Sequence, residues 1–339
     1  MRMTPPSLLV TLALLVSSGP PALAKIWKVP GNAPTVQAAV DQATSGDVIA
    51  VKKGVYKENV VFQGKVGITL KGLGNAKLAP ASGVPLSILN STQIVVRKLR
   101  IVSKEADGIS IDQSPFVRIE KCNIRSDGTG LESAIDVDLS LRTLIFDNKI
   151  KGTSFAAISL DTSDESILSG NKITRAAQNG NDLRVFGARI TVVDNQIDSP
   201  TTHLLATGSL TVDLLIAGNQ TKGSQATSIV TSSDTSGTLT LENHITGSAV
   251  GIDSGGSSEV LHGNVVKKSG TTGILLDGPS SDALANEIFK TAGNGLYVST
   301  NGLLISYNEV TKSGLFDLVE FGNPSGVYYQ NNTFGTISP

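Results

Sequence analysis

Short runs in which hydrophobic and polar residues alternate fill most of the chain, and each run leads into a repeated phrase. The phrase is Asn-x-Ile or a close variant, and it recurs from the middle of the sequence to its end. Its successive asparagines are 21 to 24 residues apart, and they are Asn148, Asn171, Asn195, Asn219, Asn243, Asn264, Asn286, Asn308 and Asn332. A constant period of this length predicts a solenoid, in which each repeat buries its apolar face against the neighbouring repeats.

The period continues towards the N-terminus through Cys122 and Leu99, at steps of 26 and 23 residues. These repeats predict ten or eleven coils, which at the usual strand spacing make a rod about 50 Å long. Cys122 is the single cysteine of the chain, so no internal disulfide can form. Because Cys122 takes an asparagine position of the repeat, we interpret it as a buried apolar filler rather than a catalytic thiol.

One repeat shows how the pattern divides into strands. Two short strands flank the turn at Asn148, and a variable loop separates them from a third strand at residues 157–161. In that third strand Ile158 is expected to point inward and Ser159 outward, because side chains alternate along a strand. Stacked coils would place the asparagines in a ladder, since an amide carries both a donor and an acceptor and tolerates left-handed turn geometry.

The two ends of the rod carry different patterns. Residues 36–43 have apolar side chains at helical spacing behind a Pro-Thr start signal. A short helix there would cover the first coil, where bare strand edges and apolar core otherwise meet water. Residues 326–334 hold an aromatic cluster that we expect to close the last coil, with a sugar-binding aromatic pair as the alternative.

The first 24 residues are typical of a secretory signal. Arg2 supplies a basic start, residues 8–16 supply an apolar core too short to span a bilayer, and residues 22–24 supply an Ala-Leu-Ala cleavage site. We therefore expect residues 25–339 to be the mature protein, a single domain that is secreted or periplasmic and has no membrane association after cleavage. An uncleaved N-terminal anchor is the alternative.

The charge composition is balanced. The chain has 28 Lys and Arg against 29 Asp and Glu, interspersed along the sequence, for a formal net charge of −1. This balance gives no electrostatic reason to expect binding to nucleic acid or to an anionic membrane. The three histidines, His203, His244 and His262, lack the spacing of metal ligands. We expect the protein to be a monomer.

With these repeats and the N-terminal helix, residues 25–339 resemble the right-handed parallel β-helix proteins of the pectin-lyase-like superfamily. The resemblance implies an all-β fold, a single right-handed parallel β-helix with an N-terminal capping helix. Residues 35–41 and 51–60 are also similar to the opening of pectin methylesterases, including their Gly-x-Tyr-x-Glu phrase at residues 54–58. In many β-helix proteins that are not esterases, the same phrase builds the first coil.

The catalytic motifs of the familiar enzymes in this superfamily are missing. The chain lacks the Gly-Arg-Pro-Trp phrase of the methylesterases, and its only tryptophan is Trp27. It also lacks the Gly-His-Gly and Asn-Thr-Asp phrases of polygalacturonases and the Trp-Ile-Asp-His phrase of the main pectate lyases. The resemblance therefore predicts the fold, excludes pectin methylesterase and polygalacturonase activity, and leaves the function to the residues themselves.

One group of outward residues has the composition of a reactive site. In the superfamily, sites usually lie on the outer face of the strand that follows the variable loop. With the aliphatic residues of these strands inward, one predicted outward column reads Ser110, Asp136, Ser159 and Arg184, and its neighbour reads Asp112, Asp138 and Asp161. The longest loop of the repeats, residues 125–133, immediately precedes this patch.

Stacked carboxylates repel one another unless a cation, a proton or a basic group lies between them. Hard oxygen ligands suit Ca²⁺, so Asp112, Asp138 and Asp161 are the candidate metal ligands. Bound Ca²⁺ would acidify the α-proton of a uronic acid, with Arg184 or Asp136 as the candidate catalytic residue that removes it. The other interpretation is that these acids are solvated outward residues, screened by Arg184.

The sequence therefore leaves two functions open. The first is an exported β-helix protein that acts on or binds an extracellular, acidic polysaccharide, and as an enzyme it would be a polysaccharide lyase or epimerase. The second is a non-catalytic surface or periplasmic module, either an adhesin-like rod or an accessory binding protein. The acidic patch beside the longest loop favours the first, and the shortage of exposed aromatics for sugar stacking favours the second.

Overall fold

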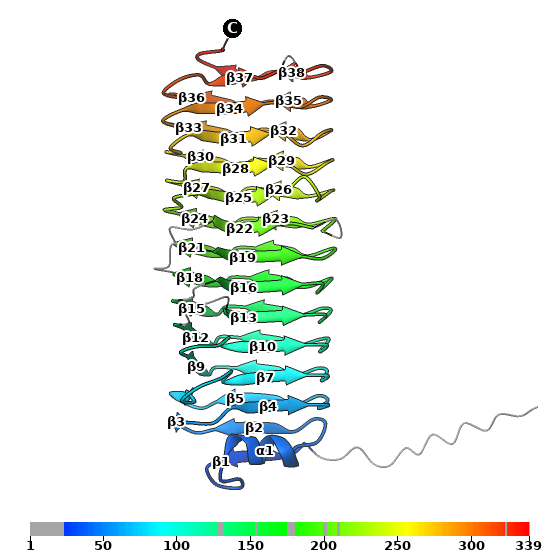
Figure 1. The fold of residues 1–339 in the computed structure, drawn as a ribbon, viewed down its shortest axis with the longest axis vertical. Coiled ribbons are helices and arrows are strands. Elements are labelled where there is room, and N and C mark those ends of the chain that lie inside the picture. The colour runs from blue at the N-terminus through cyan, green and yellow to red at the C-terminus, as the bar shows by residue number, and fades with distance from the viewer. Residues whose placement is uncertain are drawn as a thin grey trace, which may run out of the picture.

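A computed structural model describes residues 24–127, 132–152, 155–174, 180–198, 202–208, 211–322 and 324–338. It confirms the predicted all-β fold, a right-handed parallel solenoid of about 13 turns with one short helix near its N-terminal end (Figure 1). The expected ten or eleven coils were too few, because the count began at Leu99. Two further coils, formed by strands β2 to β7, precede that residue and lack the asparagine phrase.

Three parallel sheets run the length of the rod, and each coil between residues 48 and 320 contributes one strand to each of them. Sheet A precedes the asparagine turn. Within the described residues it has 14 strands, which are β1 (Ile26–Val29), β2 (Val48–Val51), β5 (Thr69–Gly72), β8 (Val95–Arg97), β11 (Arg118–Glu120), β14 (Leu144–Phe146), β17 (Ile167–Ser169), β20 (Thr191–Val193), β23 (Leu215–Ala217), β26 (Leu239–Leu241), β29 (Val260–His262), β32 (Asp282–Leu284), β35 (Leu304–Ser306) and β38 (Tyr328–Gln330).

Sheet B follows the asparagine turn and ends at the variable loop. Its 13 described strands are β3 (Gly54–Tyr56), β6 (Ala76–Leu78), β9 (Arg100–Ser103), β12 (Asn123–Ser126), β15 (Lys149–Lys151), β18 (Lys172–Thr174), β21 (Gln196–Asp198), β24 (Gln220–Lys222), β27 (His244–Thr246), β30 (Val265–Lys267), β33 (Glu287–Phe289), β36 (Glu309–Thr311) and β39 (Thr333–Phe334).

Sheet C follows the variable loop and carries the predicted site. The part of the chain that the structure describes gives it 12 strands, which are β4 (Val60–Gln63), β7 (Leu86–Leu89), β10 (Ile109–Asp112), β13 (Ser133–Asp138), β16 (Ala156–Asp161), β19 (Asn181–Phe186), β22 (Thr202–Ala206), β25 (Thr227–Thr231), β28 (Val250–Ser254), β31 (Thr272–Leu276), β34 (Asn294–Val298) and β37 (Leu318–Glu320).

The asparagine ladder is present at the turn between sheets A and B. Each buried amide joins two coils; Asn219 Nδ2, for example, donates to the Val192 carbonyl at 2.9 Å and to Asn243 Oδ1 at 3.0 Å. Cys122 continues the line, because its backbone N–H donates to Asn148 Oδ1 at 2.9 Å. Burial raises the pKa of the Cys122 thiol to about 12, which fits a structural filler.

The left-handed backbone at this turn is not at the asparagines, contrary to the expectation. It belongs to the residue immediately before each of them, such as Asp147 with φ of 56°. A second ladder, which the sequence reading missed, stands at the turn between sheets C and A. There Ser114 Oγ accepts from the Ser91 N–H at 3.0 Å, and Ser140 Oγ accepts from the Ser114 N–H at 2.9 Å. Short polar side chains therefore satisfy buried backbone donors at both turns.

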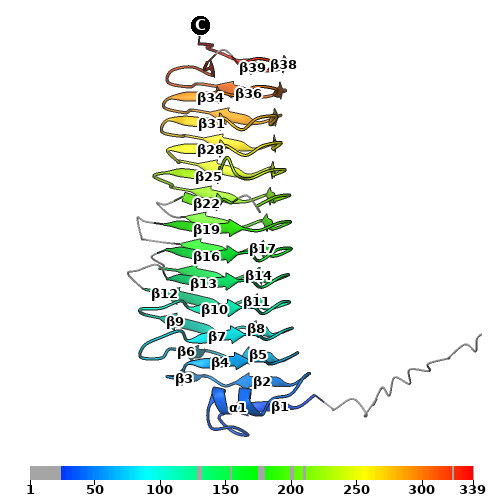
Figure 2. The same cartoon turned by 45° about the vertical axis from the view of Figure 1, so that its right-hand side comes forward.

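The helix α1 (Val36–Gln42) covers the N-terminal end of the core, as predicted (Figure 2). Its buried face is formed by Val36, Ala39 and Val40. The carboxylate of Glu58 accepts hydrogen bonds from the first-turn N–H groups of Val36 at 3.0 Å and Gln37 at 2.9 Å. The Gly-x-Tyr-x-Glu phrase thus holds the cap in place, because its glutamate satisfies two helix donors that have no partner within the helix.

The opposite end is closed only in part. Phe334 packs against the core and makes an edge contact with Tyr329, with ring centroids 6.5 Å apart. Tyr328, by contrast, is 71% exposed.

In the described residues, no helix is long and apolar enough to cross a membrane. Except for Ala24, the predicted signal lies outside these residues.

Candidate functional site

The predicted outward columns on sheet C are present in the expected register. Asp112, Asp138 and Asp161 are direct partners on β10, β13 and β16. The second column runs through Ser110, Asp136, Ser159 and Arg184 on β10, β13, β16 and β19. We call the surface formed by Asp112, Asp136, Asp138, Asp161 and Arg184 the acidic face. Its coils are about 4.8 Å apart, so each carboxyl group lies near at least one other.

A further carboxyl group, Asp107, supports this face from the loop before β10. Its Oδ1 accepts a hydrogen bond from the Ser133 N–H at 2.6 Å, which ties the loop to the start of β13. Burial raises the pKa of Asp107, the Ser133 hydrogen bond opposes the rise, and the charge of Glu132 adds to it. The sequence reading missed Asp107, because loop residues do not follow the repeat.

Asp136 lies at the centre of the acidic face and is half-buried. Burial raises its pKa to about 7, and the neighbouring charges of Asp138, Asp107 and Asp161 contribute while Arg184 opposes them. A carboxyl group with this pKa is present in both its acid and its base form near neutral pH. It can therefore give or take a proton under ordinary conditions.

Asp138 is two residues further along the same strand. Its pKa is also raised, first by burial and then by the charges of Asp161, Asp112 and Asp107, with Arg184 again opposing. The Arg184 guanidinium lies 3.8 Å from the Asp161 carboxylate and two coils from Asp136. Arg184 is thus a cation at one end of a cluster of acids, and it neutralises part of their negative charge.

The geometry gives no direct support for a metal centre. In the described part of the chain, no three His, Cys, Asp or Glu side chains converge on a position where a metal ion could be held. Asp112, Asp138 and Asp161 form a straight column instead of a cage. Residues 128–131 of the loop beside them lie outside the described residues, so the Ca²⁺ site stays a prediction.

A second group of acids lies on the same sheet. Asp253 is in the column of Asp136, five coils further along the rod. Burial raises its pKa to about 6, with contributions from the charges of Asp277 and Glu259. Glu259 is buried and accepts hydrogen bonds from the hydroxyl groups of Ser254, Thr231 and Thr235. Because the structure already satisfies Glu259, we assign it a structural role.

Three residues have the composition of a serine hydrolase triad, but they are not accessible to a substrate. Asp182, His203 and Ser228 occupy neighbouring strands in register, and His203 Nδ1 lies 3.2 Å from Ser228 Oγ. All three side chains have 0% of their surface exposed. No substrate reaches Ser228 in this arrangement, so these residues are a polar part of the core.

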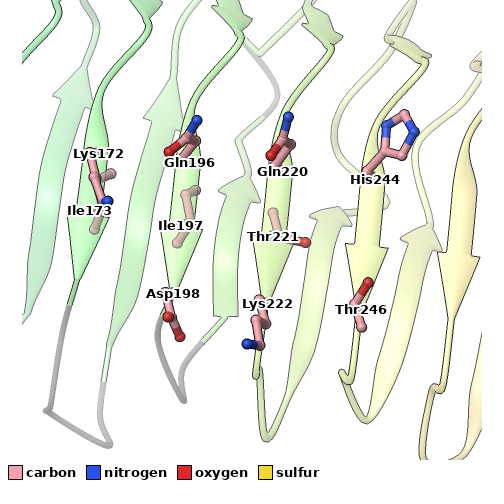
Figure 3. Close-up of a pocket in the computed structure, with 10 residues that line it drawn as sticks. All are labelled: Lys172, Ile173, Gln196, Ile197, Asp198, Gln220, Thr221, Lys222, His244 and Thr246. Atoms are coloured by element: carbon pink, nitrogen blue, oxygen red, sulfur yellow. The ribbon is translucent and has the colours of Figure 1, made fainter.

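A hollow in the surface lies on sheet B, away from the acidic face. It has a volume of about 510 Å³ and is bounded by residues of β18, β21, β24 and β27, including Lys172, Gln196, Gln220 and His244 (Figure 3). None of these residues was a candidate in the sequence reading. Each of the four coils contributes two or three of the lining residues, so they form no continuous motif in the sequence.

The family described as "Right handed beta helix region" matches residues 75–220. Solved structures match most of the chain at low identity. The catalytic unit of a thermostable GH87 α-1,3-glucanase from Streptomyces thermodiastaticus strain HF3-3 is 14% identical, with 94% of this chain and 70% of that chain covered and a TM-score of 0.62. A mannuronic acid specific polysaccharide family 6 lyase from human gut microbiota is also 14% identical, with 93% and 82% covered and a TM-score of 0.61.

Tailspike protein 3 of bacteriophage CBA120 is 12% identical, with 89% of this chain and 55% of that chain covered and a TM-score of 0.54. These likenesses concern the fold. The protein thus has the right-handed parallel β-helix fold that the asparagine ladder and the capping helix indicated.

Proposed function

We propose that the protein is a polysaccharide-processing enzyme whose catalytic surface is the acidic face of sheet C. The observation that carries this proposal is the position of Asp136, which is half-buried on β13 in the column of Arg184 and beside the column of Asp138 and Asp161. Two proteins of the same fold are named as a glucanase and a polysaccharide lyase, which supports a glycan as the substrate. Such a face has the proton donors and acceptors that the cleavage of a glycosidic bond requires.

Hydrolysis of a glycosidic bond is the reaction that this geometry supports best. Asp136 and Asp138 are two residues apart on one strand and both face outward, so their carboxyl groups lie on the same surface. Inverting glycosidases use two carboxyl groups in this way, one as the acid and one as the base that activates a water molecule. Asp136 in its acid form would protonate the leaving oxygen, and the carboxylate of Asp138 would activate the water.

Elimination is the second candidate, and the position of Arg184 favours it. A guanidinium beside the acids could pair with the carboxylate of a uronic acid, which the acidic face would otherwise repel. Asp136 in its base form would then remove the α-proton of that sugar. Asp112, Asp138 and Asp161 would be the ligands of a Ca²⁺ ion, which would make that proton more acidic. This is the lyase or epimerase expected from the sequence.

Product analysis separates these reactions. Purified protein is incubated with neutral glucans and with polyuronates, with Ca²⁺ and with a chelator. New reducing ends without ultraviolet absorbance indicate hydrolysis, and unsaturated products that absorb in the ultraviolet indicate elimination. A requirement for Ca²⁺ supports the metal site, and equal rates with the chelator exclude it.

The variant Asp136→Asn should lose the reaction in either case. The control variant Asp194→Asn changes an exposed turn residue that already has left-handed backbone, which asparagine tolerates. It should keep full activity. If the folded wild-type protein cleaves none of these glucans or polyuronates, the protein is not the proposed enzyme, and the non-catalytic module is the remaining function.

We also propose that the protein is exported and that its signal is removed after Ala24. The support is the composition of residues 1–24. N-terminal sequencing of protein recovered from the periplasm or the medium tests this, with Lys25 expected as the first residue. Retention in the membrane fraction with an intact N-terminus would indicate an uncleaved anchor instead.

A further inference from the structure

The outer face of sheet B carries an unbroken line of side chains that donate hydrogen bonds. The first outward position of eight successive strands, from β6 to β27, is occupied by a lysine, arginine, histidine or amide residue. In order along the rod they are Lys77, Arg100, Asn123, Lys149, Lys172, Gln196, Gln220 and His244. The line ends at Val265 and is followed by Glu287 and Glu309. These eight coils extend over about 34 Å at the usual strand spacing.

The surface beside this line is hollowed along the same coils. Besides the hollow of about 510 Å³ near Lys172, there is one of about 250 Å³ near Lys149 and one of about 280 Å³ near Arg100. Asn123 lines both smaller hollows, and Lys172 lines both the middle hollow and the largest one. The three hollows therefore follow one another along the donor line. We call the surface made of the donor line and these hollows the basic groove.

The floor of the groove is backbone, because the residue between its two outward rows points into the core. Ile173 and Ile197 are such residues, and both are buried (Figure 3). The second row contains Lys151, Asp198 and Lys222. Asp198 is the one acid lining these hollows in the part of the chain that the structure describes. The groove is thus lined mainly by cations and amides.

The cations in its middle are available to a ligand. Lys149, Lys151 and Lys172 are exposed, and no carboxylate of the described residues lies within ion-pair distance of them. Three stacked cations repel one another just as stacked acids do. A ligand with regularly spaced negative charges would relieve this repulsion along several coils at once.

We propose that the basic groove binds a linear acidic polysaccharide. Lys149, Lys172 and Arg100 would pair with its carboxylate or sulfate groups, and the amides of Asn123, Gln196 and Gln220 would bind its hydroxyl groups. The groove lies on a different sheet from the acidic face. This binding site therefore goes beyond the proposed reaction and does not depend on it.

Several features favour a glycan over a nucleic acid as the occupant. Proteins that bind single strands stack the bases on aromatic side chains, and His244 is the only ring among the described residues that line the groove. Alternating amides and cations suit a ligand that offers both hydroxyl groups and charges. The net charge of −1 also provides no long-range attraction for a nucleic acid.

The test measures binding of polygalacturonate oligomers to the full chain by isothermal titration calorimetry, at low and at moderate salt. The variant Lys149→Gln/Lys172→Gln should weaken binding by about tenfold or more, since two charge-assisted contacts are lost. The matched control, Lys28→Gln/Lys312→Gln, removes two exposed lysines that line none of the three hollows, and it should bind like the wild type.

Three results would overturn the proposal. They are no binding at low salt, equal affinity of the groove variant and the control variant, or tighter binding of single-stranded DNA than of polygalacturonate. The groove variant should also keep any cleavage that depends on Asp136. If the groove variant loses binding but still cleaves, the basic groove is a separate site from the acidic face. If the wild type binds polygalacturonate but cleaves no glycan, the proposed reaction is wrong and the groove proposal stands.

Discussion

The guanidinium of Arg184 lies 3.8 Å from the carboxylate of Asp161, and its positive charge lowers the pKa of both Asp136 and Asp138. Burial and neighbouring acids outweigh this effect at both aspartates, so their pKa values stay above the ordinary range. Arg184 is therefore the residue through which the acidity of the face can be changed without altering a carboxyl group.

Replacing Arg184 with glutamine should raise the pKa of Asp136 above its value of about 7. Loss of a positive charge disfavours the ionised carboxylate, so the titration moves to higher pH. Nuclear magnetic resonance of labelled aspartate carboxyl carbons measures the shift. The control is Arg189→Gln, which removes a guanidinium paired with Glu165 instead. Titration of Asp136 at the same pH in both variants would contradict the role of Arg184.

Asp136 should also make the stability of the protein depend on pH. Its pKa is about 7 in the folded chain against an ordinary value of 3.8, so the folded state favours the protonated form. This contribution to stability is complete below about pH 4 and is lost as the pH rises towards about 7. The amide of Asp136→Asn cannot ionise, so the variant does not lose this stability as the pH rises. It should therefore be more stable than the wild type at pH 8, by a few kcal/mol at most.

Urea unfolding of both proteins at pH 4 and pH 8 measures this effect. At pH 4 the two free energies of unfolding should nearly agree, because the neutral acid and the amide are similar in size. A stability difference that is the same at both pH values would show that the carboxyl group of Asp136 is not held in its acid form.

The asparagine ladder should be required for stability at its centre. Asn219 Oδ1 accepts from the backbone N–H and the side-chain amide of Asn195, both at 3.0 Å. Asn219→Leu would leave these buried groups and the Val192 carbonyl without partners, at a cost of about 2 to 5 kcal/mol. Thermal unfolding measures the loss against the control Gln220→Leu, an exposed neighbour. An unchanged melting temperature for Asn219→Leu would show that the ladder contributes little.

Glu58 should stabilise the N-terminal cap. Its carboxylate satisfies two first-turn donors of α1, so Glu58→Ala should cost about 1 to 2 kcal/mol. Chemical unfolding compares it with Glu105→Ala, which changes an exposed loop glutamate. Hydrogen exchange at Val36 and Gln37 should rise in the first variant only. Equal exchange in both variants would mean that the helix is held by its apolar face alone.

The sequence was sufficient to predict the fold and the placement of the acidic face. A repeat of nearly constant length sets the stacking, and alternation along a strand then decides which residues face outward. Asp112, Asp138 and Asp161 consequently stand in one column, as expected. The coil count was low because the first coils lack asparagine at the turn. At this turn, backbone torsion angles alone locate the left-handed residue one position before each asparagine.

Other parts of the two sites were not accessible from the sequence. Asp107 acts from a variable loop, whose path no repeat dictates. The donor line of the basic groove takes one residue from each coil, and successive members are more than 20 positions apart in the sequence. A signal for it was nevertheless present. In each Asn-x-Ile phrase the middle residue points outward when the third points inward, because side chains alternate along a strand. Reading that middle position down the chain gives Lys149, Lys172, Gln196, Gln220 and His244.

Proton transfer by Asp136 is tested most directly by the rate of glycan cleavage against pH, for the wild type and for Asp136→Asn. The substrate is the glycan of the panel that the wild type cleaves fastest. If Asp136 is the acid, the wild-type rate should fall as the pH rises above about 7, and the variant should be slower by about 100-fold or more at every pH. Equal rates for the two folded proteins, or no cleavage by the wild type on any glycan, would contradict a catalytic acidic face.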